Sequence, residues 1–211
     1  TSLRNYRNAL DEAGRDELIG TIQEEAERLN RFIANLLDMT RLVSGALVPH
    51  LEPVDLGDIV GSALERAQKF LGAHKVEIDL ARPLPLLRLD PVLFEQVLFN
   101  LLDNAAKYAP PRSPIRVQAR REGAAVRLQV IDEGPGIPPA DLDRIFDKFY
   151  RVRARDRQRA GTGLGLAVCR GFVEAMGGRI VAANRQEQHG AVFAITLPVA
   201  ADPSAATEAL A

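Results

Sequence analysis

The first 52 residues carry a hydrophobic repeat that the rest of the chain lacks. Positions spaced alternately by three and four residues are apolar or small, and a helix with this heptad pattern needs other helices beside it. The pattern predicts a long helix over about residues 16–44 and self-association through it. A helix of this length would span roughly 42 Å at 1.5 Å per residue, longer than the core of such a domain, although packing against its own domain alone stays open as the alternative. The repeat comprises Ile19, Ile22, Ala26, Leu29, Ile33, Leu36, Thr40 and Val43.

From residue 51 onward the pattern changes to short helices and strands bounded by Pro and Gly. Asp90 and Pro91 are typical of a helix start, as N-cap and first helical residue. Residues 115–121 and 125–131 alternate apolar and polar side chains around a tight connection, which predicts a hairpin. We expect a helical segment over residues 1–52 with a further short helical piece at 1–10, an α/β domain over 53–199 and a flexible tail over 200–211. Helices are predicted at 57–71, 91–106 and 165–176, and strands at 76–80, 86–89, 115–121, 125–131, 179–183 and 192–197.

Composition narrows the classes of protein. The chain of 211 residues is 46% hydrophobic and 26% charged, which favours an ordinary globular protein over a disordered one. A net charge of -1 gives no overall attraction for nucleic acid, so no direct nucleic-acid partner is expected. A lone cysteine, Cys169, and the lack of a long apolar stretch predict a cytoplasmic protein that would reach a membrane only through segments absent from this sequence.

Four polar or glycine-rich segments carry candidate chemistry, the first of them late in the helix that follows Asp90. Asn100 and Asn104 are four residues apart and therefore share a face, with Lys107 one turn further on. Amide oxygens can hold a metal ion without adding charge, and a lysine ammonium can bind phosphate. Alternatively, both amides bond to nearby backbone groups.

The second segment, residues 132–137, directly follows a predicted strand. Gly134 and Gly136 let a flat ligand approach the backbone closely. An ionised Asp132 can accept a hydrogen bond from an amino group such as that of adenine. Considered alone, the segment is also compatible with an ordinary turn.

The third and fourth segments flank an arginine-rich stretch at 153–159. The third, residues 145–151, is aromatic and ends at Arg151, and with the arginines it predicts a mobile lid that faces phosphate. The segment lacks spaced aromatic side chains on which bases could stack, which disfavours a groove that binds single-stranded nucleic acid. The fourth, residues 161–166, places glycines before a helix, where free backbone N–H groups bind anions.

In their order along the chain, the four segments resemble the N, G1, F and G2 boxes of the histidine-kinase branch of the Bergerat-fold ATPases, a superfamily shared with gyrase, Hsp90 and MutL. The resemblance covers about residues 51–198. The long helix, with its stretch 35–41, is similar to the second helix of the dimerisation and phosphotransfer domain. Residues 94–102, 145–149 and 177–178 resemble the KdpD-type potassium-responsive sensor kinases.

The resemblance implies an α/β sandwich in which a mixed sheet backs three helices and ATP lies between helix and lid, with Mg²⁺ as the metal. It implies that Asp132 binds the adenine amino group, that Asn104 coordinates magnesium, and that Asn100 and Lys107 lie beside the phosphates. Further implied nucleotide-site residues are Tyr108, Arg151 for the γ-phosphate, Gly134, Gly136, Gly161, Thr162, Gly163, Leu164 and Gly165.

The implied activity is that of a protein-histidine kinase, which passes the γ-phosphoryl group of ATP to a histidine and then to an aspartate of a response-regulator receiver domain. In the hydrolysing relatives a glutamate acts as general base where Asn100 stands. Because an amide cannot take a proton from water, we expect ATP to be held for transfer rather than hydrolysed quickly. None of His50, His74 and His189 fits the family's phospho-acceptor pattern, so this polypeptide alone is predicted not to autophosphorylate.

Two alternatives are set against the kinase interpretation. The first is a nucleotide-binding module for dimerisation and docking without kinase turnover, which the retained polar groups of the four segments disfavour. The second is an ATPase of the same superfamily that acts on other proteins or DNA, which would carry a glutamate at position 100. The expected partners are therefore a receiver domain and a second copy of this chain.

Overall fold

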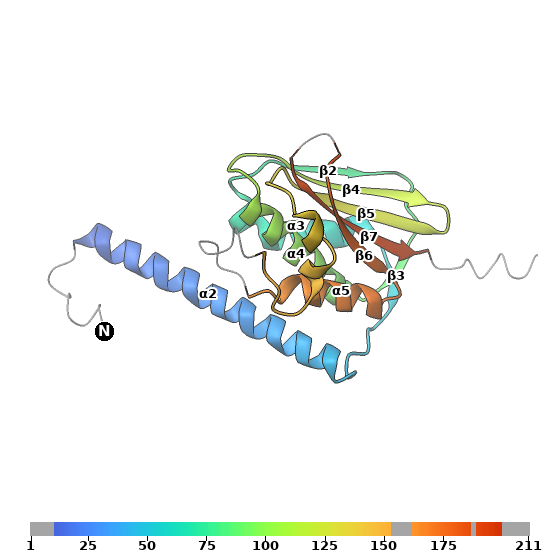
Figure 1. Ribbon diagram of the computed structural model, residues 1–211, viewed down its shortest axis with the longest axis horizontal. Coiled ribbons are helices and arrows are strands. Elements are labelled where there is room, and N and C mark those ends of the chain that lie inside the picture. Colours follow the sequence, from blue (N-terminus) through green and yellow to red (C-terminus); the bar gives the residue numbers. More distant parts are fainter. Residues whose placement is uncertain (1–10, 153–161, 187–188, 200–211) are drawn as a thin grey trace, which may run out of the picture.

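The computed structural model describes residues 11–152, 162–186 and 189–199 (Figure 1). The predicted helical piece at 1–10, the arginine-rich stretch at 153–159 and the predicted tail at 200–211 lie outside them. The helices are α2 (Glu12–Val43), α3 (Leu56–Leu71), α4 (Pro91–Tyr108) and α5 (Gly165–Ala175), with short 3-10 turns η1 (Pro139–Asp141) and η2 (Arg144–Phe146). The strands are β1 (Glu52–Val54), β2 (Val76–Leu80), β3 (Leu87–Leu89), β4 (Ile115–Glu122), β5 (Ala125–Ile131), β6 (Arg179–Asn184) and β7 (Ala191–Pro198).

Five strands form one mixed sheet in the order β2-β4-β5-β7-β6. The pair β2 and β4 is parallel, and the remaining neighbours are antiparallel. The predicted hairpin is the pair β4 and β5, in which Glu122 faces Ala125 across the turn. The short strands β1 and β3 form a separate antiparallel pair. This arrangement confirms the mixed sheet that the sequence led us to expect.

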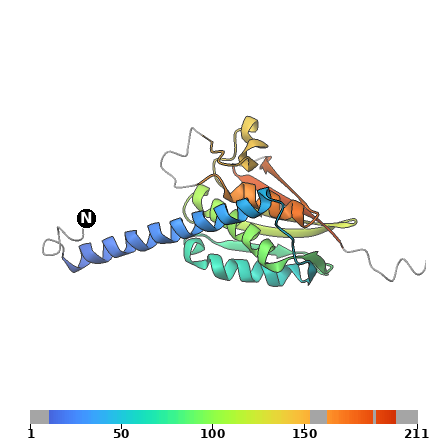
Figure 2. The ribbon, with the colours of Figure 1, turned by 90° about the horizontal axis from the view of Figure 1, so that it is seen from below.

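Helices α3, α4 and α5 cover one face of the sheet (Figures 1 and 2). Their apolar sides and the inward side chains of the strands make one continuous core, in which Phe94 and Phe172 are among the largest fully buried side chains. Cys169 of α5 lies in the same core, and burial raises the pKa of its thiol to about 12. The chain's one cysteine is therefore a buried free thiol.

The start of α4 explains how the central helix is held. Asp90 Oδ1 accepts the backbone N–H groups of Val92 and Leu93, and Pro91 occupies the first helical position. Asp90 Oδ2 accepts the backbone N–H of His50, which ties the preceding linker to the helix start. The predicted N-cap is therefore confirmed, and α4 runs two residues beyond its predicted end at 106.

Helix α2 is continuous over 32 residues, and its first half extends away from the rest of the molecule (Figures 1 and 2). Its second half packs against α5, where Met39 is buried. The heptad residues remain on another face, with Ile22 51% and Leu29 56% exposed. One face of the helix thus packs on its own domain. The face formed by the heptad residues, called the seam below, is exposed to solvent. No helix in the described ranges is long and apolar enough to cross a membrane.

Candidate nucleotide site

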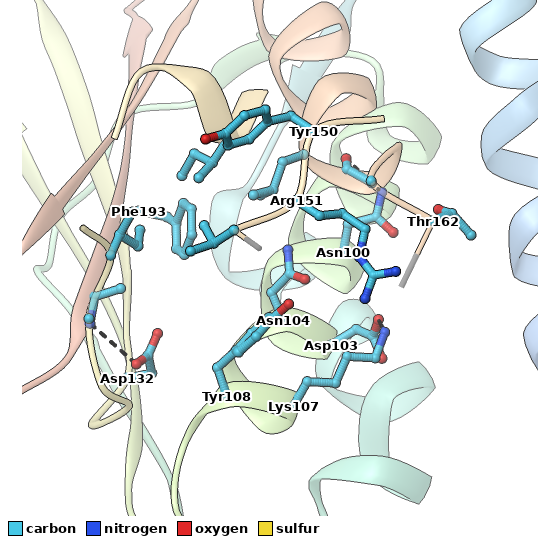
Figure 3. A pocket seen from close by; sticks show the side chains of 18 of the residues that line it. Asn100, Asp103, Asn104, Lys107, Tyr108, Asp132, Tyr150, Arg151, Thr162 and Phe193 are labelled. Atoms are coloured by element: carbon cyan, nitrogen blue, oxygen red, sulfur yellow. Dashed lines mark hydrogen bonds and ion pairs between the residues drawn. The ribbon is translucent and has the colours of Figure 1, made fainter. Parts of the chain in front are cut away.

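A cavity lies between α4, the segment after β5 and the start of α5 (Figure 3). Ten of the residues singled out from the sequence line it: Asn100, Asn104, Lys107, Tyr108, Asp132, Gly136, Arg151, Thr162, Gly163 and Gly165. The four segments, far apart in the sequence, therefore meet at one place. None of the three histidines is in the lining that the structure describes.

Two other predicted residues, Gly134 and Leu164, are not in the described lining of the cavity. Leu164, the residue before α5, is fully buried in the core, and its N–H donates to Thr162 Oγ1 at 3.4 Å. Gly134 lies behind Asp132, where an added Cβ would be 2.8 Å from Asp132 Oδ1 and 2.9 Å from the carbonyl oxygen of Tyr108. Gly134 therefore shapes the wall by close packing. Gly161 lies outside the described residues.

Asp132 is a buried carboxylate with only 4% of its surface exposed. Its Oδ1 accepts the backbone N–H groups of Gly134 at 2.7 Å and Ala191 at 3.2 Å. Burial raises the pKa of Asp132, and these two hydrogen bonds and the charge of Arg185 partly offset the rise. Because both described bonds end on Oδ1, Oδ2 is the atom offered to a ligand. A single buried acceptor of this kind selects a ligand N–H.

The neighbouring residue, Glu133, anchors this segment to two strands. Its Oε1 accepts hydrogen bonds from Arg185 Nη1 at 3.1 Å and from Arg116 Nη2 at 3.5 Å. Arg116 also donates from Nε to Glu77 Oε2 at 2.9 Å. Charge pairs between β2, β4 and the segment after β5 therefore hold the backbone on which Asp132 is carried.

Helix α4 presents a polar row to the cavity, as the spacing of Asn100, Asn104 and Lys107 predicted (Figure 3). The amide of Asn100 is held on both sides, because its Oδ1 accepts from Gln96 Nε2 at 3.2 Å and its Nδ2 donates to Gly165 O at 3.5 Å. Lys107 Nζ pairs with Asp103 Oδ2 one turn earlier. The row therefore combines the fixed amide of Asn100 with the ammonium of Lys107. A phosphate group could replace Asp103 as the partner of that ammonium.

Two described segments, one before residue 153 and one after residue 161, meet beside the cavity. Phe149 N–H donates to Gly163 O at 2.9 Å, and a Cβ on Gly163 would lie 2.7 Å from the Phe149 carbonyl carbon. Gly163 has φ +71°, so glycine suits this position on both counts. Arg151, two residues after Phe149, and Thr162, one residue before Gly163, both line the cavity. No described side chain caps the start of α5 beside them, which presents backbone N–H groups and the positive end of a helix dipole.

Several lining residues were not predicted from the sequence. They are Asn35, Asp103, Pro135, Ile137, Pro138, Ile145, Tyr150, Val152, Leu166, Ala191 and Phe193. Most supply apolar surface, which a flat aromatic ligand needs beside the Asp132 acceptor. Asp103 could have been noticed because it shares a turn with Asn100 and Lys107, whereas nothing in the spacing of β7 identifies Ala191 and Phe193.

The donors of the site fit magnesium bound together with phosphate rather than a protein-only metal centre. Within the described ranges, no group of three or more His, Cys, Asp or Glu side chains could hold a metal ion. The cavity does present the oxygens of Asn104, Asn100 and Asp103 along one helix. Magnesium commonly takes one or two protein oxygens and completes its shell with phosphate oxygens and water. An acceptor for an amine at one end, and amides, cations and a helix start at the other, suit a purine nucleotide.

The chain is similar in sequence to a known family and to known sensor proteins. Residues 89–201 match the family described as histidine kinase-, DNA gyrase B-, and HSP90-like ATPase. The sensor protein KdpD of Escherichia coli strain K12 is 43% identical over 177 residues, which cover 84% of this chain and 20% of that protein. This chain thus spans about a fifth of the length of the KdpD proteins that it matches.

Two solved structures agree with the sequence comparison. The mycobacterial sensor histidine kinase MprB superposes with a TM-score of 0.63 at 28% identity, covering 70% of this chain and 97% of that one. Full-length ShkA in complex with AMPPNP superposes with a TM-score of 0.73 at 26% identity, covering 94% of this chain and 42% of that one.

Fold and site together define an ATP-binding domain of the mixed α/β type. The chain belongs to the histidine kinase-, DNA gyrase B- and HSP90-like ATPase family, and it contains the ATPase catalytic domain found in two-component sensor histidine kinases. The resemblance read from the four segments is thereby confirmed, whereas the individual roles of the site residues remain predictions.

Proposed function

We propose that this chain is the ATP-binding part of a sensor kinase that transfers the γ-phosphoryl group of ATP to a histidine. A nitrogen of that histidine forms the new bond to phosphorus as the bond to the leaving ADP breaks. The phosphoryl group would then pass to an aspartate of a response-regulator receiver domain. The convergence of Asp132, Asn104 and Lys107 on one cavity is the observation that carries this proposal.

The proposed roles follow from the chemistry of each side chain. Asp132 Oδ2 accepts the adenine amino group, and Asn104 with phosphate oxygens would hold Mg²⁺, which neutralises charge on the polyphosphate. Lys107, released from Asp103, and Arg151 bind phosphate oxygens. Tyr108 lies one turn beyond Asn104 and completes the wall.

The side chain at position 100 distinguishes phosphoryl transfer from ATP hydrolysis. Its amide is held by Gln96 and Gly165, and an amide cannot remove a proton from water at neutral pH. The site therefore favours keeping ATP until a histidine arrives. The same point disfavours an ATPase that acts on DNA or other proteins by hydrolysis.

The proposal extends to the whole protein. The partners would be a receiver domain and a second copy of this chain, paired through the exposed seam of α2, and residues 1–52 would form part of the dimerisation segment. A cytoplasmic location belongs to the same proposal, as does attachment of the parent protein to an inner membrane through segments outside this sequence.

Calorimetric titration with a non-hydrolysable ATP analogue and Mg²⁺ tests the core of this proposal. We expect one-to-one binding, weakened about 10- to 100-fold in Asp132→Asn, because a charge-assisted hydrogen bond contributes about 1.5–3 kcal/mol. Asn104→Ala should weaken binding only when Mg²⁺ is present. The control is Asp58→Asn, an exposed carboxylate in the first turn of α3.

Transfer itself is tested by adding a separate histidine-bearing helical segment together with radiolabelled ATP. Label on that segment, dependent on Lys107, would support kinase function. Binding without any transfer to such a segment would favour the alternative of a docking module. No binding by a chain that melts cooperatively would show the proposal to be wrong.

A further inference from the structure

Helix α2 contributes one residue, Asn35, to the described lining of the nucleotide cavity. Every other described lining residue lies after residue 90, in the domain that carries the site. Asn35 is therefore the only described point at which the long helix borders the place where ATP would bind. The sequence indicated only that Asn35 begins the stretch 35–41, which resembles a dimerisation helix, and it predicted no role for Asn35 at the site.

The packing of α2 on α5 fixes the position of Asn35. Met39, four residues later on the same face, is 6% exposed and belongs to the core. Leu42 is next along this face, and a Cβ built on Gly171 of α5 would lie 2.5 Å from Leu42 Cδ1. Gly171 thus allows the two helices to approach closely. Asn35 is held against the cavity by contacts on its C-terminal side.

The amide of Asn35 carries a buried oxygen that has no hydrogen-bond partner among the described residues. Oδ1 is shielded from solvent, and no described residue donates a hydrogen bond to it. Leaving a buried acceptor without a donor costs about 1–3 kcal/mol, so such an atom is commonly satisfied by a ligand or an ordered water. The amide also carries Nδ2, which can donate to an anionic oxygen.

The position of Asn35 along the cavity indicates which part of a bound nucleotide it would contact. Figure 3 shows α2 on the side of the site where Thr162 lies, with Arg151 between Thr162 and Asn104. Asp132 lies on the opposite side of the site. The end near α2 therefore holds the cationic and helix-start groups that suit phosphate. A polyphosphate with its bound water offers both partners that an amide needs, an anionic oxygen for Nδ2 and a water for Oδ1.

We propose that Asn35 is a nucleotide-contact residue supplied by the long helix, and that it binds the terminal phosphate of ATP. This inference rests on the proposed function. It makes docking of α2 and occupancy of the site by ATP favour each other, because a contact between the two contributes to both equilibria. ADP, which lacks the terminal phosphate, would not gain the contact.

Asn35→Ala and the matched control Asn30→Ala test the inference. Asn30 is an exposed asparagine of the same helix, five residues earlier. We expect Asn35→Ala to weaken binding of the Mg²⁺ complex of a non-hydrolysable ATP analogue about tenfold, the loss of one charge-assisted hydrogen bond. ADP affinity should change less than about twofold by the same comparison. Asn30→Ala should match the unmodified chain with both nucleotides.

A second substitution separates contact from packing. Asn35→Asp keeps an acceptor but places a negative charge toward phosphate, so it should weaken ATP-analogue binding at least as much as Asn35→Ala. Equal loss of ATP-analogue and ADP affinity, or full binding by Asn35→Asp, would overturn the inference, as would unchanged binding by Asn35→Ala. In those cases binding by the unmodified chain would leave the proposed function standing. Failure of the unmodified chain to bind would remove both.

Hydrogen exchange supplies an independent readout of the coupling. The ATP analogue should slow amide exchange at Met39 and Leu42 in the unmodified chain and in Asn30→Ala, but not in Asn35→Ala at saturating nucleotide. Slowing that is equal in all three chains would contradict the proposed contact.

Discussion

Asn184 holds Ile137 by both of its backbone groups. Asn184 Oδ1 accepts the Ile137 N–H at 2.7 Å, and Asn184 Nδ2 donates to the Ile137 carbonyl oxygen, also at 2.7 Å. The last residue of β6 thereby fixes the glycine segment that follows Asp132. Gly136 lies so close that a Cβ there would be 2.8 Å from Asn184 Oδ1. The wall of the cavity is positioned by a strand at the edge of the sheet.

The first prediction concerns Asn184→Ala, which removes both bonds. Because these bonds are solvent-accessible, we expect the free energy of unfolding to fall by about 1 kcal/mol. ATP-analogue affinity should fall about threefold to tenfold, since ordering of the segment would then oppose binding. Calorimetric titration and thermal melting provide the measurements, and Gln186→Ala, an exposed amide in the next turn, is the control. Unchanged affinity in Asn184→Ala would contradict the positioning role.

The second prediction concerns Gly190, which lies against the backbone of Asp132. Gly190 has φ +138°, and a Cβ there would lie 2.0 Å from the Asp132 backbone oxygen. Gly190→Ala must therefore displace the Asp132 backbone or distort the turn, and we expect a loss of about 1–3 kcal/mol in stability together with most of the nucleotide affinity. Gly20→Ala, with nothing within 4 Å of the added Cβ, should instead stabilise α2 by roughly 0.5–1 kcal/mol. Thermal melting of the two variants tests this prediction. Equal changes in stability in Gly190→Ala and Gly20→Ala would show it to be wrong.

Local sequence patterns defined the elements well because the forces that form them are local. Strand β5 coincides with its predicted range 125–131, where alternation of apolar and polar residues is strict. The N-cap bonds of Asp90 Oδ1 and the hydrogen bonds that end α5 at Gly177 involve neighbouring backbone groups only. The candidate site also emerged, because four chemically distinctive segments occur in one order.

Features that depend on tertiary contact were not predictable in the same way. The sheet order, and the pairing of β1 with β3, result from contacts between residues far apart in sequence. The seam of α2 suggested either self-association or packing on its own domain, and the structure shows Met39 packed while Ile33 is exposed. Asn35 did leave a signal, since it is a polar residue between Phe32 and Met39 on the packed face.

The third prediction concerns the titration of Asp132. Burial raises its pKa above the ordinary value of 3.8, so the folded chain binds more protons than the unfolded chain between these two values. The contribution of Asp132 to stability is therefore greatest below 3.8, decreases as pH rises toward the raised pKa, and is constant above it. Adenine binding should require the ionised form, so nucleotide affinity should fall as pH is lowered through the raised pKa.

Carbon-13 NMR of the Asp132 carboxyl carbon, assigned with Asp132→Asn, measures this directly. We expect a midpoint above 3.8 in the free chain and a lower midpoint with the ATP analogue bound, because the ligand N–H favours the carboxylate. A free-chain midpoint at or below 3.8 would mean that the hydrogen bonds to Oδ1 outweigh burial. A midpoint unchanged by nucleotide would remove Asp132 from the adenine contact.

The fourth prediction concerns self-association through the open face of α2. Leu29 and Ile33 are 56% and 45% exposed, and burying such side chains contributes about 1.5–3 kcal/mol each. We expect sedimentation equilibrium at several concentrations to show a dimer, and the double substitution Leu29→Lys with Ile33→Lys to shift it toward monomer, because lysines would face each other across the seam. Thr21→Lys places a single lysine off the seam and should leave the dimer intact. A monomer at every concentration for the unmodified chain, or equal dissociation in the control, would show that this face does not pair two copies.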